Sequence, residues 1–370
     1  MNFSYWEIKS WFTNIDFTIV GSGIVGLSCA LHLKRRFPKS KILILEKGML
    51  PQGASTKNAG FACFGSLSEI LDDLKSHSEK EVIDLVKKRF NGLQLLRETL
   101  NDKKIGYKNY GGYELFDKND VLFQESLSKI DIINRMLFPI FRADIFSIKN
   151  NIFNFKNIEN QCVFNPFEGQ IDTGMMMEAL LKKVQSKDIK ILNNVTVEHF
   201  EEIQNSVKIK TNWLEFSTSK LLIATNGFAS QLINEEVKPA RAQVLITKPI
   251  KNLQLKGTFH LDKGYYYFRN IDNRVLVGGG RNLDFKSEET TEFHHTQLIQ
   301  DALESLLKTS ILAETPFEIE YRWTGIMGMG NQKKAIVKQL SNHVYCGVRL
   351  GGMGIAIGSL IGKELSQILD

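Results

Sequence analysis

Cysteine is scarce in this 370-residue sequence, and its four cysteines are far apart in the chain. They are Cys29, Cys63, Cys162 and Cys346. This separation fits neither the ligand spacing of a zinc site nor a Cys-x-x-Cys redox motif, and the seven histidines lack ligand spacing as well. We therefore expect no metal site, and reduced thiols in a cytoplasmic protein.

The sequence also lacks a long hydrophobic run and a block of like charge. Its longest apolar stretch, Phe17 to Leu33, is just short of a membrane span and is interrupted by three glycines and His32. Residues 1–9 contain no basic segment followed by an apolar one, which argues against a secretion signal. The net charge of +6 is spread along the chain, so we expect no nucleic-acid partner.

The overall composition is that of an ordinary globular protein, with 43% hydrophobic and 24% charged residues. A chain of 370 residues exceeds what one hydrophobic core usually serves. We therefore expect two domains that share one bound cofactor.

The most informative stretch, residues 16–33, predicts a buried strand, a glycine turn and an amphipathic helix in succession. Gly21 would make the tight turn, Gly23 would let the backbone approach a pyrophosphate, and Gly26 would let the helix pack on the strand. Unpaired N–H groups at the helix start would then bind the phosphates. This pattern is a dinucleotide-binding fingerprint. The cofactor-binding residues expected here are Gly21, Gly23, Ile24, Val25 and Gly26.

A second apolar strand, residues 41–45, ends in an acidic residue. Glu46 follows the glycine turn at the roughly 20-residue spacing expected of a carboxylate that binds a ribose hydroxyl. Lys47 is expected to line the same site. The alternative, a glycine-rich loop in an unrelated α/β domain, leaves Glu46 unexplained.

Residues 53–66 are a run of small residues without periodicity, Gly-Ala-Ser-Thr-Lys-Asn-Ala-Gly-Phe-Ala-Cys-Phe-Gly-Ser. A loop of this composition can approach a ligand closely. Together with the fingerprint, it resembles the D-amino-acid oxidase superfamily of flavoproteins, which includes glycine oxidase and sarcosine oxidase. The resemblance implies that this loop passes beside the flavin ring of FAD. The residues expected to bind FAD from this loop are Ser55, Thr56, Asn58, Ala59 and Gly60.

Later segments resemble the same family. By this resemblance, Val195 lies by the adenine through its backbone, and the Ala-Thr-Asn-Gly turn after the strand of residues 220–224 returns toward FAD. The turn before the last helix resembles the Gly-x-x-Gly-x-Gly turn of the family, except that Arg349 stands in place of the first glycine. The implied FAD contacts are Val195, Thr225, Asn226, Gly227, Arg349, Gly351, Gly352, Met353, Gly354 and Ile355.

Hydrophobic periodicity and turn signals predict most other elements in outline. A hairpin around two glycines is expected in residues 107–116, whereas residues 141–164 carry little signal. Met175, Met176 and Met177 are expected in the core of a helix that Asp172 and Thr173 begin. The other helices are expected over residues 4–12, 82–100, 121–141, 292–307 and 357–368.

From Lys238 onward, two-residue alternation and short turns predict an antiparallel sheet that includes residues 265–269, 274–281 and 318–325. We therefore expect an α/β fold in which a Rossmann-like FAD-binding domain joins an α+β substrate domain. The FAD-binding domain is expected to comprise residues 14–62, 166–230 and 340–370, and the substrate-binding domain residues 63–165 and 231–339.

The resemblance implies oxidation of the C–N bond of a small amine or amino acid. A hydride passes to flavin N5, the imine hydrolyses, and oxygen or another acceptor reoxidises the flavin. No His, Asp or Glu stands out as a general base, which is tolerable if the substrate enters as its neutral amine. Residues 321–336, where sarcosine oxidases attach their flavin covalently, contain no cysteine, so noncovalent FAD is expected.

Other functions stay open. Sarcosine oxidases carry a lysine that assists the reaction with oxygen on the strand equivalent to residues 274–281, whereas the inward positions here are apolar. The second hypothesis is therefore an FAD-dependent dehydrogenase that oxidises an amino or 2-hydroxy acid and passes electrons to an acceptor other than oxygen. A third is an NAD-binding or cofactor-free interaction module.

The substrate is expected to be an anionic amine held by Tyr265, Tyr267 and Arg281. Tyr265 aligns with the tyrosine that glycine oxidase uses for its substrate carboxylate. Strand alternation places Tyr267 on the same face. Arg281 ends the neighbouring strand pattern and is expected to face the same cavity.

The family carboxylate site is incomplete in this sequence, because Met327 stands where the arginine of glycine oxidase should be. The planar guanidinium of Arg281 could replace that arginine. Arg349, at the flavin end of its strand, is the second candidate. Alternatively, Arg281 is a surface residue or pairs with Asp284.

Overall fold

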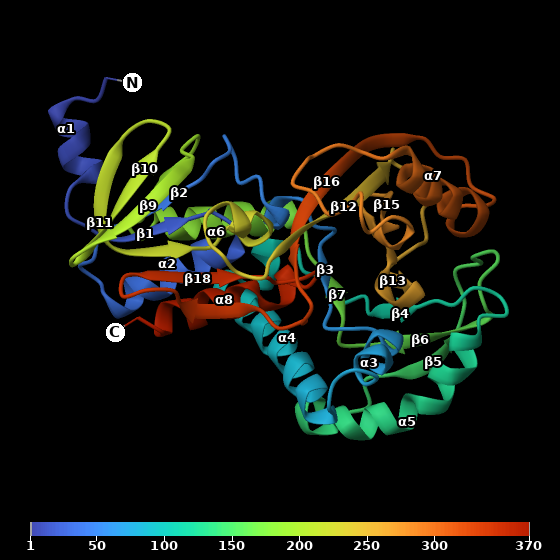
Figure 1. The fold of residues 1–370 in the computed structure, drawn as a ribbon. Coiled ribbons are helices and arrows are strands. Elements are labelled where there is room, and N and C mark those ends of the chain that lie inside the picture. Colours follow the sequence, from blue (N-terminus) through green and yellow to red (C-terminus); the bar gives the residue numbers. More distant parts are fainter. Residues whose placement is uncertain (1, 370) are drawn as a thin grey trace.

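The first of two large sheets is organised around the glycine turn (Figure 1). The computed structural model describes residues 2–369. Strand β1 (Ile15–Val20) pairs in parallel with β2 (Ile42–Leu45) and with β11 (Glu215–Ile223), so the turn that follows β1 leaves the middle of the sheet. The strand order is β17 (Ile336–Gln339), β18 (Val344–Val348), β11, β1, β2 and β8 (Lys190–Leu192), and β10 (Ser206–Thr211) and β9 (Val197–Ile203) extend antiparallel from β11.

Two helices pack closely on each other beside this sheet. They are α2 (Ile24–Arg36), which follows the glycine turn, and α8 (Gly354–Gln367), which follows the closing turn. A Cβ atom at Gly362 of α8 would lie 2.6 Å from the carbonyl oxygen of Val25, so only glycine permits this contact. The strands beneath read as continuous apolar runs because they are buried, as β2 is along its whole length.

Helix α4 (Glu79–Leu100) joins the core of the first sheet. Leu93, Leu96 and Leu100 are buried there, and a Cβ atom at Gly92 would lie 2.2 Å from the carbonyl oxygen of Ala356. The helix was expected within the substrate domain, since its sequence periodicity identifies an apolar face but not the partner of that face. Strand β17, which was also expected in the substrate domain, likewise belongs to the first sheet.

The second sheet confirms the antiparallel pattern expected for the later half of the chain. Its strands pair antiparallel except for the parallel pair β13–β4. Their order is β16 (Ile319–Met329), β12 (Lys238–Thr247), β15 (Arg274–Gly279), β14 (Tyr266–Ile271), β13 (Thr258–Leu261), β4 (Gly112–Glu114), β6 (Gln161–Asn165) and β5 (Ser147–Asn150). A separate short pair joins β3 (Phe61–Ala62) to β7 (Gly169–Gln170).

The hairpin expected in residues 107–116 is wrong. Strand β4 instead lies between β13 and β6, which are distant in the sequence. The two glycines at the start of β4 permit close packing rather than a turn, because a Cβ atom at Gly111, just before the strand, would lie 2.3 Å from the Phe164 ring and one at Gly112 would lie 2.0 Å from Glu168. Residues 141–164, which showed little signal, contain β5 and most of β6.

The helices match the expected pattern where capping and periodicity agree. Helix α5 spans Val121–Phe141, and α6 spans Thr173–Gln185 behind the Asp172 carboxylate, which accepts a hydrogen bond from the Met175 N–H. Met176 and Met177 are buried, but Met175 is 41% exposed and does not belong to the core. Helices α1 (Tyr5–Glu7) and α3 (Leu67–Asp73) begin with serine capping boxes. Among the described residues, none of the helices combines the length and apolar character needed to cross a membrane.

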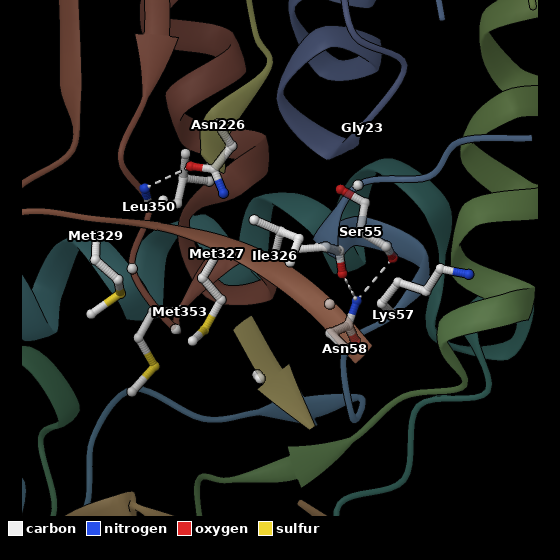
Figure 2. Close-up of a pocket in the computed structure, with 18 of the residues that line it drawn as sticks. Gly23, Ser55, Lys57, Asn58, Asn226, Ile326, Met327, Met329, Leu350 and Met353 are labelled. Atoms are coloured by element: carbon white, nitrogen blue, oxygen red, sulfur yellow. Dashed lines mark hydrogen bonds between the residues drawn. The ribbon is translucent and has the colours of Figure 1, made fainter. Parts of the chain in front are cut away.

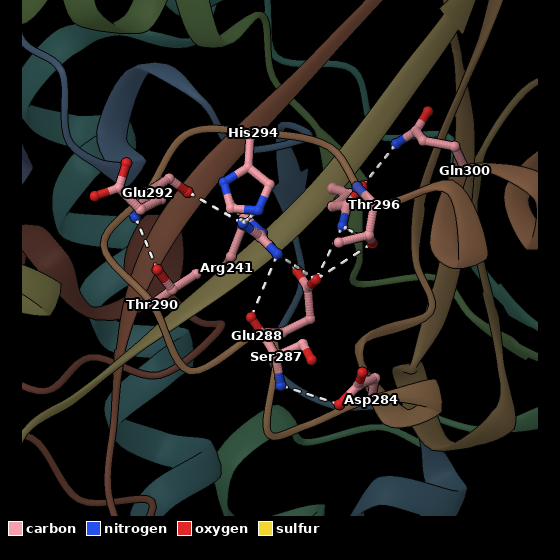
Figure 3. A network of polar contacts seen from close by, with 10 residues as sticks. Arg241, Asp284, Ser287, Glu288, Thr290, Glu292, His294, Thr296 and Gln300 are labelled. Atoms are coloured by element: carbon pink, nitrogen blue, oxygen red, sulfur yellow. Dashed lines mark hydrogen bonds and ion pairs between the residues drawn. The ribbon is translucent and has the colours of Figure 1, made fainter.

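Helix α7 (Gln297–Leu306) begins later than expected, because a buried polar network holds the preceding segment in another conformation (Figure 3). Arg241 of β12 donates to both carboxylate oxygens of Glu288 at 2.8 and 2.6 Å, and both side chains are inaccessible to solvent. The Arg241 guanidinium also contacts the ring of His294, which therefore lies in this segment and not on a helix. The network fastens residues 284–296 to the second sheet.

Candidate active site

A cavity of about 880 Å³ lies where the two sheets meet. Glu46 and Val195 line it from the first sheet, and Tyr267 and Arg281 line it from the second sheet or its connecting turns. Its volume lies within the range typical of cofactor and substrate sites. The carboxyl ends of parallel strands reach it, which is where open α/β sheets bind ligands.

The glycine turn has the geometry that the fingerprint predicts. Gly21 has a φ of +105°, and a Cβ atom at Gly26 would lie 2.0 Å from the carbonyl oxygen of Gly21. Gly26 therefore permits packing and does not itself line the cavity, in contrast to Gly21, Gly23, Ile24 and Val25. The Ile24 N–H donates to the Ser55 hydroxyl at 3.0 Å, and the other first-turn amides lack intrahelical acceptors.

Glu46 is buried at the edge of the cavity, and Lys47 follows it in the lining. The Glu46 Oε2 atom accepts hydrogen bonds from the N–H and the hydroxyl of Ser22, at 3.0 and 2.7 Å. Its Oε1 atom accepts one from the Gly48 N–H at 3.1 Å. These bonds hold the carboxylate in a position from which it could also accept hydrogen bonds from the hydroxyl groups of a ribose.

The small-residue loop reaches the cavity in a conformation that its own side chains maintain (Figure 2). The Asn58 amide donates to the carbonyl of Ser55 and accepts from the Gly60 N–H. Ser55, Asn58, Ala59 and Gly60 line the cavity, but the Thr56 hydroxyl donates to the Pro51 carbonyl and does not line it. Thr56 therefore stabilises the turn, which corrects its expected role as a cofactor contact.

Arg269 of β14 connects this loop to the second sheet. It is 2% exposed and donates to the carbonyls of Gly60 and Ile171, at 3.2 and 2.8 Å. Burial lowers the pKa of Arg269 to about 10. Sequence reasoning missed this residue, because strand alternation does not reveal which loop a side chain will meet.

The closing turn leaves open space at three of its glycines. No atom lies within 4 Å of a Cβ placed at Gly351 or Gly354, and a Cβ at Gly352 meets only the Met327 sulfur at 3.9 Å. The turn is held by Asn226, whose Oδ1 accepts the Leu350 N–H at 3.1 Å (Figure 2). Met353 and Ile355 complete the lining.

Two residues expected at this end have different roles. Arg349 lines the cavity as expected, but its guanidinium donates to the Lys334 carbonyl and pairs with Glu236 at 3.3 Å, so it is engaged within the protein and is not a free cation. Gly227 does not line the cavity; a Cβ atom there would lie 2.6 Å from the Met327 carbonyl oxygen. Thr225 lines the cavity, and its buried hydroxyl has no partner within residues 2–369.

Val195 lines the cavity as expected, although its N–H already donates to the Glu46 carbonyl at 2.9 Å. Its amide is therefore not available to an adenine. The remaining backbone group at this position is its carbonyl.

The residues expected to hold the substrate lie at this one cavity. Tyr265, Tyr267 and Arg281 all line the cavity. Burial raises the pKa of Tyr267 to about 12, so its hydroxyl stays protonated. Arg281 lies just after β15, because Gly279 and Gly280 have positive φ values and end the strand.

The Arg281 guanidinium has no ion-pair partner in the described part of the chain, and it stacks 4.7 Å from the centre of the Phe285 ring. The expected alternative, pairing with Asp284, does not occur among the described residues, and the Asp284 carboxylate accepts the Ser287 N–H. Met327 lines the cavity in place of the family arginine.

Sequence reasoning missed a cluster of buried polar residues at the same cavity. One side-chain oxygen, nitrogen and sulfur atom from Glu168, His260 and Cys63 lie within 4.8 Å of one another, and all three residues are buried. His260 and Cys63 line the cavity, as does Arg89 of α4, which is 4% exposed and donates to the Phe64 carbonyl. These residues lie far apart in the sequence and form no motif.

An apolar cluster borders the same cavity. Ala59, Val244 and Leu276 form a small buried cluster that contacts Phe61 and Tyr267. On β12 and β15, Val244 is opposite Gly278 and Leu276 is opposite Ile246, so the positions on this face are apolar, as expected.

Comparison with known proteins decides the family. The family model described as FAD dependent oxidoreductase matches residues 16–368. The chain belongs to this family. It is similar to γ-glutamylputrescine oxidoreductase of Escherichia coli K12, with 22% identity covering 96% of this chain and 83% of the relative. Mitochondrial L-2-hydroxyglutarate dehydrogenase of Bos taurus is 23% identical, covering 81% and 67% of the two chains. Glycine oxidase of Bacillus cereus ATCC 14579 has the same fold, with a TM-score of 0.73, 17% identity and coverage of 96% and 94%.

The family confirms the resemblance, the fold class and the FAD-dependent oxidoreductase activity expected from the sequence. The cavity fits FAD, because the closing turn leaves open space at its glycines and the buried Thr225 hydroxyl lacks a partner within residues 2–369. Bound FAD supplies hydride-accepting redox chemistry, and the protein supplies binding and orientation. The residues that would hold it are those of the glycine turn, Glu46, the small-residue loop and the closing turn.

Replacing Glu46 with alanine is expected to weaken FAD binding by about 1 to 3 kcal/mol, the scale of a charge-assisted hydrogen bond. Flavin fluorescence during titration of the apoprotein measures the dissociation constant. Glu215→Ala, at an exposed position of β11 in the same sheet, is the control. Retention of FAD by Glu46→Ala as tight as that of the parent protein would contradict the ribose assignment.

Proposed function

We propose that this FAD-dependent oxidoreductase oxidises the C–N bond of a small amine or amino acid, giving an imine that hydrolyses. The observation that carries the proposal is the Arg281 guanidinium, which has no ion-pair partner among residues 2–369 and lines the same cavity as Tyr265 and Tyr267. A guanidinium and two phenols suit a carboxylate. The similarity to γ-glutamylputrescine oxidoreductase supports an amine as the oxidised group.

The second candidate is a dehydrogenase that oxidises an amino or 2-hydroxy acid and passes electrons to an acceptor other than oxygen. It is supported by the apolar Leu276 and Val244 on the inward face, where sarcosine oxidases carry a lysine for the reaction with oxygen. The similarity to L-2-hydroxyglutarate dehydrogenase points the same way.

Further features of the enzyme stay proposals. We infer noncovalent FAD, because residues 321–336 contain no cysteine and because burial raises the pKa of the Cys63 thiol well above its usual range, which disfavours a thiolate. The division into an FAD-binding and a substrate-binding domain, the lack of a resident metal and of a nucleic-acid partner, and a cytoplasmic location remain predictions.

Anaerobic bleaching of the bound flavin tests the function. The holoprotein is mixed with a panel that includes glycine, L-proline, γ-glutamylputrescine and L-2-hydroxyglutarate, and flavin absorbance is followed. Bleaching by an amino compound supports the proposal, and bleaching by the hydroxy acid alone supports the second candidate. Oxygen consumption with the active compound then separates an oxidase from a dehydrogenase. Failure of every amine and amino acid to bleach the flavin would contradict C–N oxidation.

Replacing Arg281 with lysine keeps the charge but removes the planar fork. We expect the dissociation constant of the active compound to rise by about tenfold, a loss of about 1.4 kcal/mol, while FAD stays bound. The concentration dependence of flavin reduction measures this constant, and Arg274→Lys, at a partly exposed position that pairs with Glu320, is the control. Unchanged reduction kinetics would remove Arg281 from the substrate site.

A further inference from the structure

His260 and Glu168 form a buried pair at the cavity that the function described so far does not use. The His260 Nε2 atom lies 3.1 Å from Glu168 Oε2, and the two residues are 6% and 1% exposed. Since Nε2 faces the carboxylate, Nδ1 is the ring nitrogen that remains for a ligand. The other Glu168 oxygen, Oε1, is buried without a hydrogen-bond partner within residues 2–369. A hydrogen-bond network within the protein therefore does not account for the buried carboxylate.

The pair adjoins the residues expected to hold the substrate. His260 of β13 is the direct cross-strand neighbour of Tyr267 of β14. Cross-strand neighbours project to the same face of a sheet. The Phe61 ring contacts both, with centroid distances of 5.3 Å to the His260 ring and 5.4 Å to the Tyr267 ring. A molecule held by Tyr267 is therefore within reach of His260.

The surroundings of His260 are acidic. Burial by itself lowers the pKa of His260, but nearby carboxylates outweigh it, so the pKa is raised above its ordinary value. Glu114, the β4 residue paired with His260, accepts hydrogen bonds from Ser66 and Ser68. The titratable or charged groups around the ring are Cys63, Glu69, Arg89, Glu114, Glu168 and Tyr267.

We propose that His260 is the acid–base residue of this enzyme and that Glu168 positions its ring. The proposal rests on the proposed function, because it assigns the fate of the substrate proton in that reaction. The substrate carbon gives up hydrogen with both bonding electrons to bound FAD. The bond between the substrate heteroatom and its hydrogen breaks, its electron pair completes the C=N or C=O double bond, and the proton forms an N–H bond at Nδ1 of neutral His260.

This proposal departs from the expectation that no residue stands out as a general base. It also extends the range of substrates, since a base allows an ammonium group or a hydroxyl group to lose its proton inside the cavity. The alternative is that His260 and Glu168 only stabilise the fold. Buried ion pairs, however, contribute little net stability compared with apolar residues of similar volume.

The kinetic test follows anaerobic flavin reduction by the active panel compound across pH. In the parent enzyme, the rate is expected to rise with pH through the raised pKa of His260, because only the neutral ring accepts a proton. Glu168→Gln should move this inflection to lower pH. His260→Asn should abolish it and slow reduction by roughly 100- to 10,000-fold, while His199→Asn, on the exposed part of β9, should change neither. Parental rates and pH dependence in His260→Asn would overturn the proposal.

The second measurement needs no substrate. Proton–carbon NMR of holoprotein with labelled histidine rings, assigned by the signal lost in His260→Asn, gives the titration of His260. A downward shift in Glu168→Gln supports the pair, and no shift overturns it. If no panel compound bleaches the flavin, the proposed function fails while this titration still decides the role of Glu168. A divalent metal bound stoichiometrically in the parent and lost in His260→Asn would replace the acid–base role with metal binding by Cys63, Glu168 and His260.

Discussion

Replacing Glu288 with alanine is expected to lower the free energy of unfolding by about 3 to 5 kcal/mol. Glu288 and Arg241 form an ion pair whose side chains are both inaccessible to solvent. The change would leave the Arg241 guanidinium buried with only the His294 ring and backbone carbonyls as partners. An unpaired charge in that position costs far more than the pair itself contributes.

Glu289→Ala is the matched control, because it removes the neighbouring carboxylate, which forms an exposed pair with Lys238. Its expected cost is at most about 1 kcal/mol. Urea denaturation of the holoproteins, followed by circular dichroism, compares the two variants. Equal stability of Glu288→Ala and Glu289→Ala would contradict the importance of the buried pair for residues 284–296.

The parts of the fold that local physics determines could be predicted from the sequence. The parallel strands, the glycine turn and helix α2 follow from residues close together in the chain, and α5 has the predicted bounds because its periodicity and its Asp120 cap agree. The α6 start was predictable for the same reason, since Asp172 caps it. Within that helix, however, three consecutive methionines cannot all face one side, which is why Met175 is exposed.

The parts that depend on distant partners could not be predicted. Strand β4 pairs with β13, and no local signal names that partner. Glu168 and His260 are 92 residues apart in the sequence, so the sequence does not show that their side chains form a pair. Arg349 lines the cavity as expected, but the sequence could not show that Glu236 and the Lys334 carbonyl also engage its guanidinium.

The family resemblance supplied what local physics could not, but only where this chain keeps the family motif. It located the loop at Asn58 and Gly60, and both line the cavity. At Met327 the chain departs from the motif, and the resemblance gives no substitute for the missing arginine. The strand pattern indicated Arg281 instead, and Arg281 lines the cavity; that its guanidinium has no ion-pair partner among residues 2–369 is seen only in the structure.

Replacing Gly352 with valine is expected to leave the fold intact while raising the FAD dissociation constant by about 100-fold, or about 2.7 kcal/mol. A Cβ atom at Gly352 meets only the Met327 sulfur at 3.9 Å, and the residue does not have a positive φ. The protein itself therefore tolerates a side chain there. The added methyl groups would occupy the open space at the closing turn, where the flavin must approach the backbone.

Gly26→Val provides the contrast that makes this result interpretable. A Cβ atom at Gly26 would lie 2.0 Å from the Gly21 carbonyl oxygen, so that variant should lose both stability and FAD. For Gly352→Val, thermal unfolding of the apoprotein should match the parent protein, and only the flavin titration should change. If Gly352→Val binds FAD with the parental affinity, absorption spectrum and reduction potential, the closing turn does not approach the flavin.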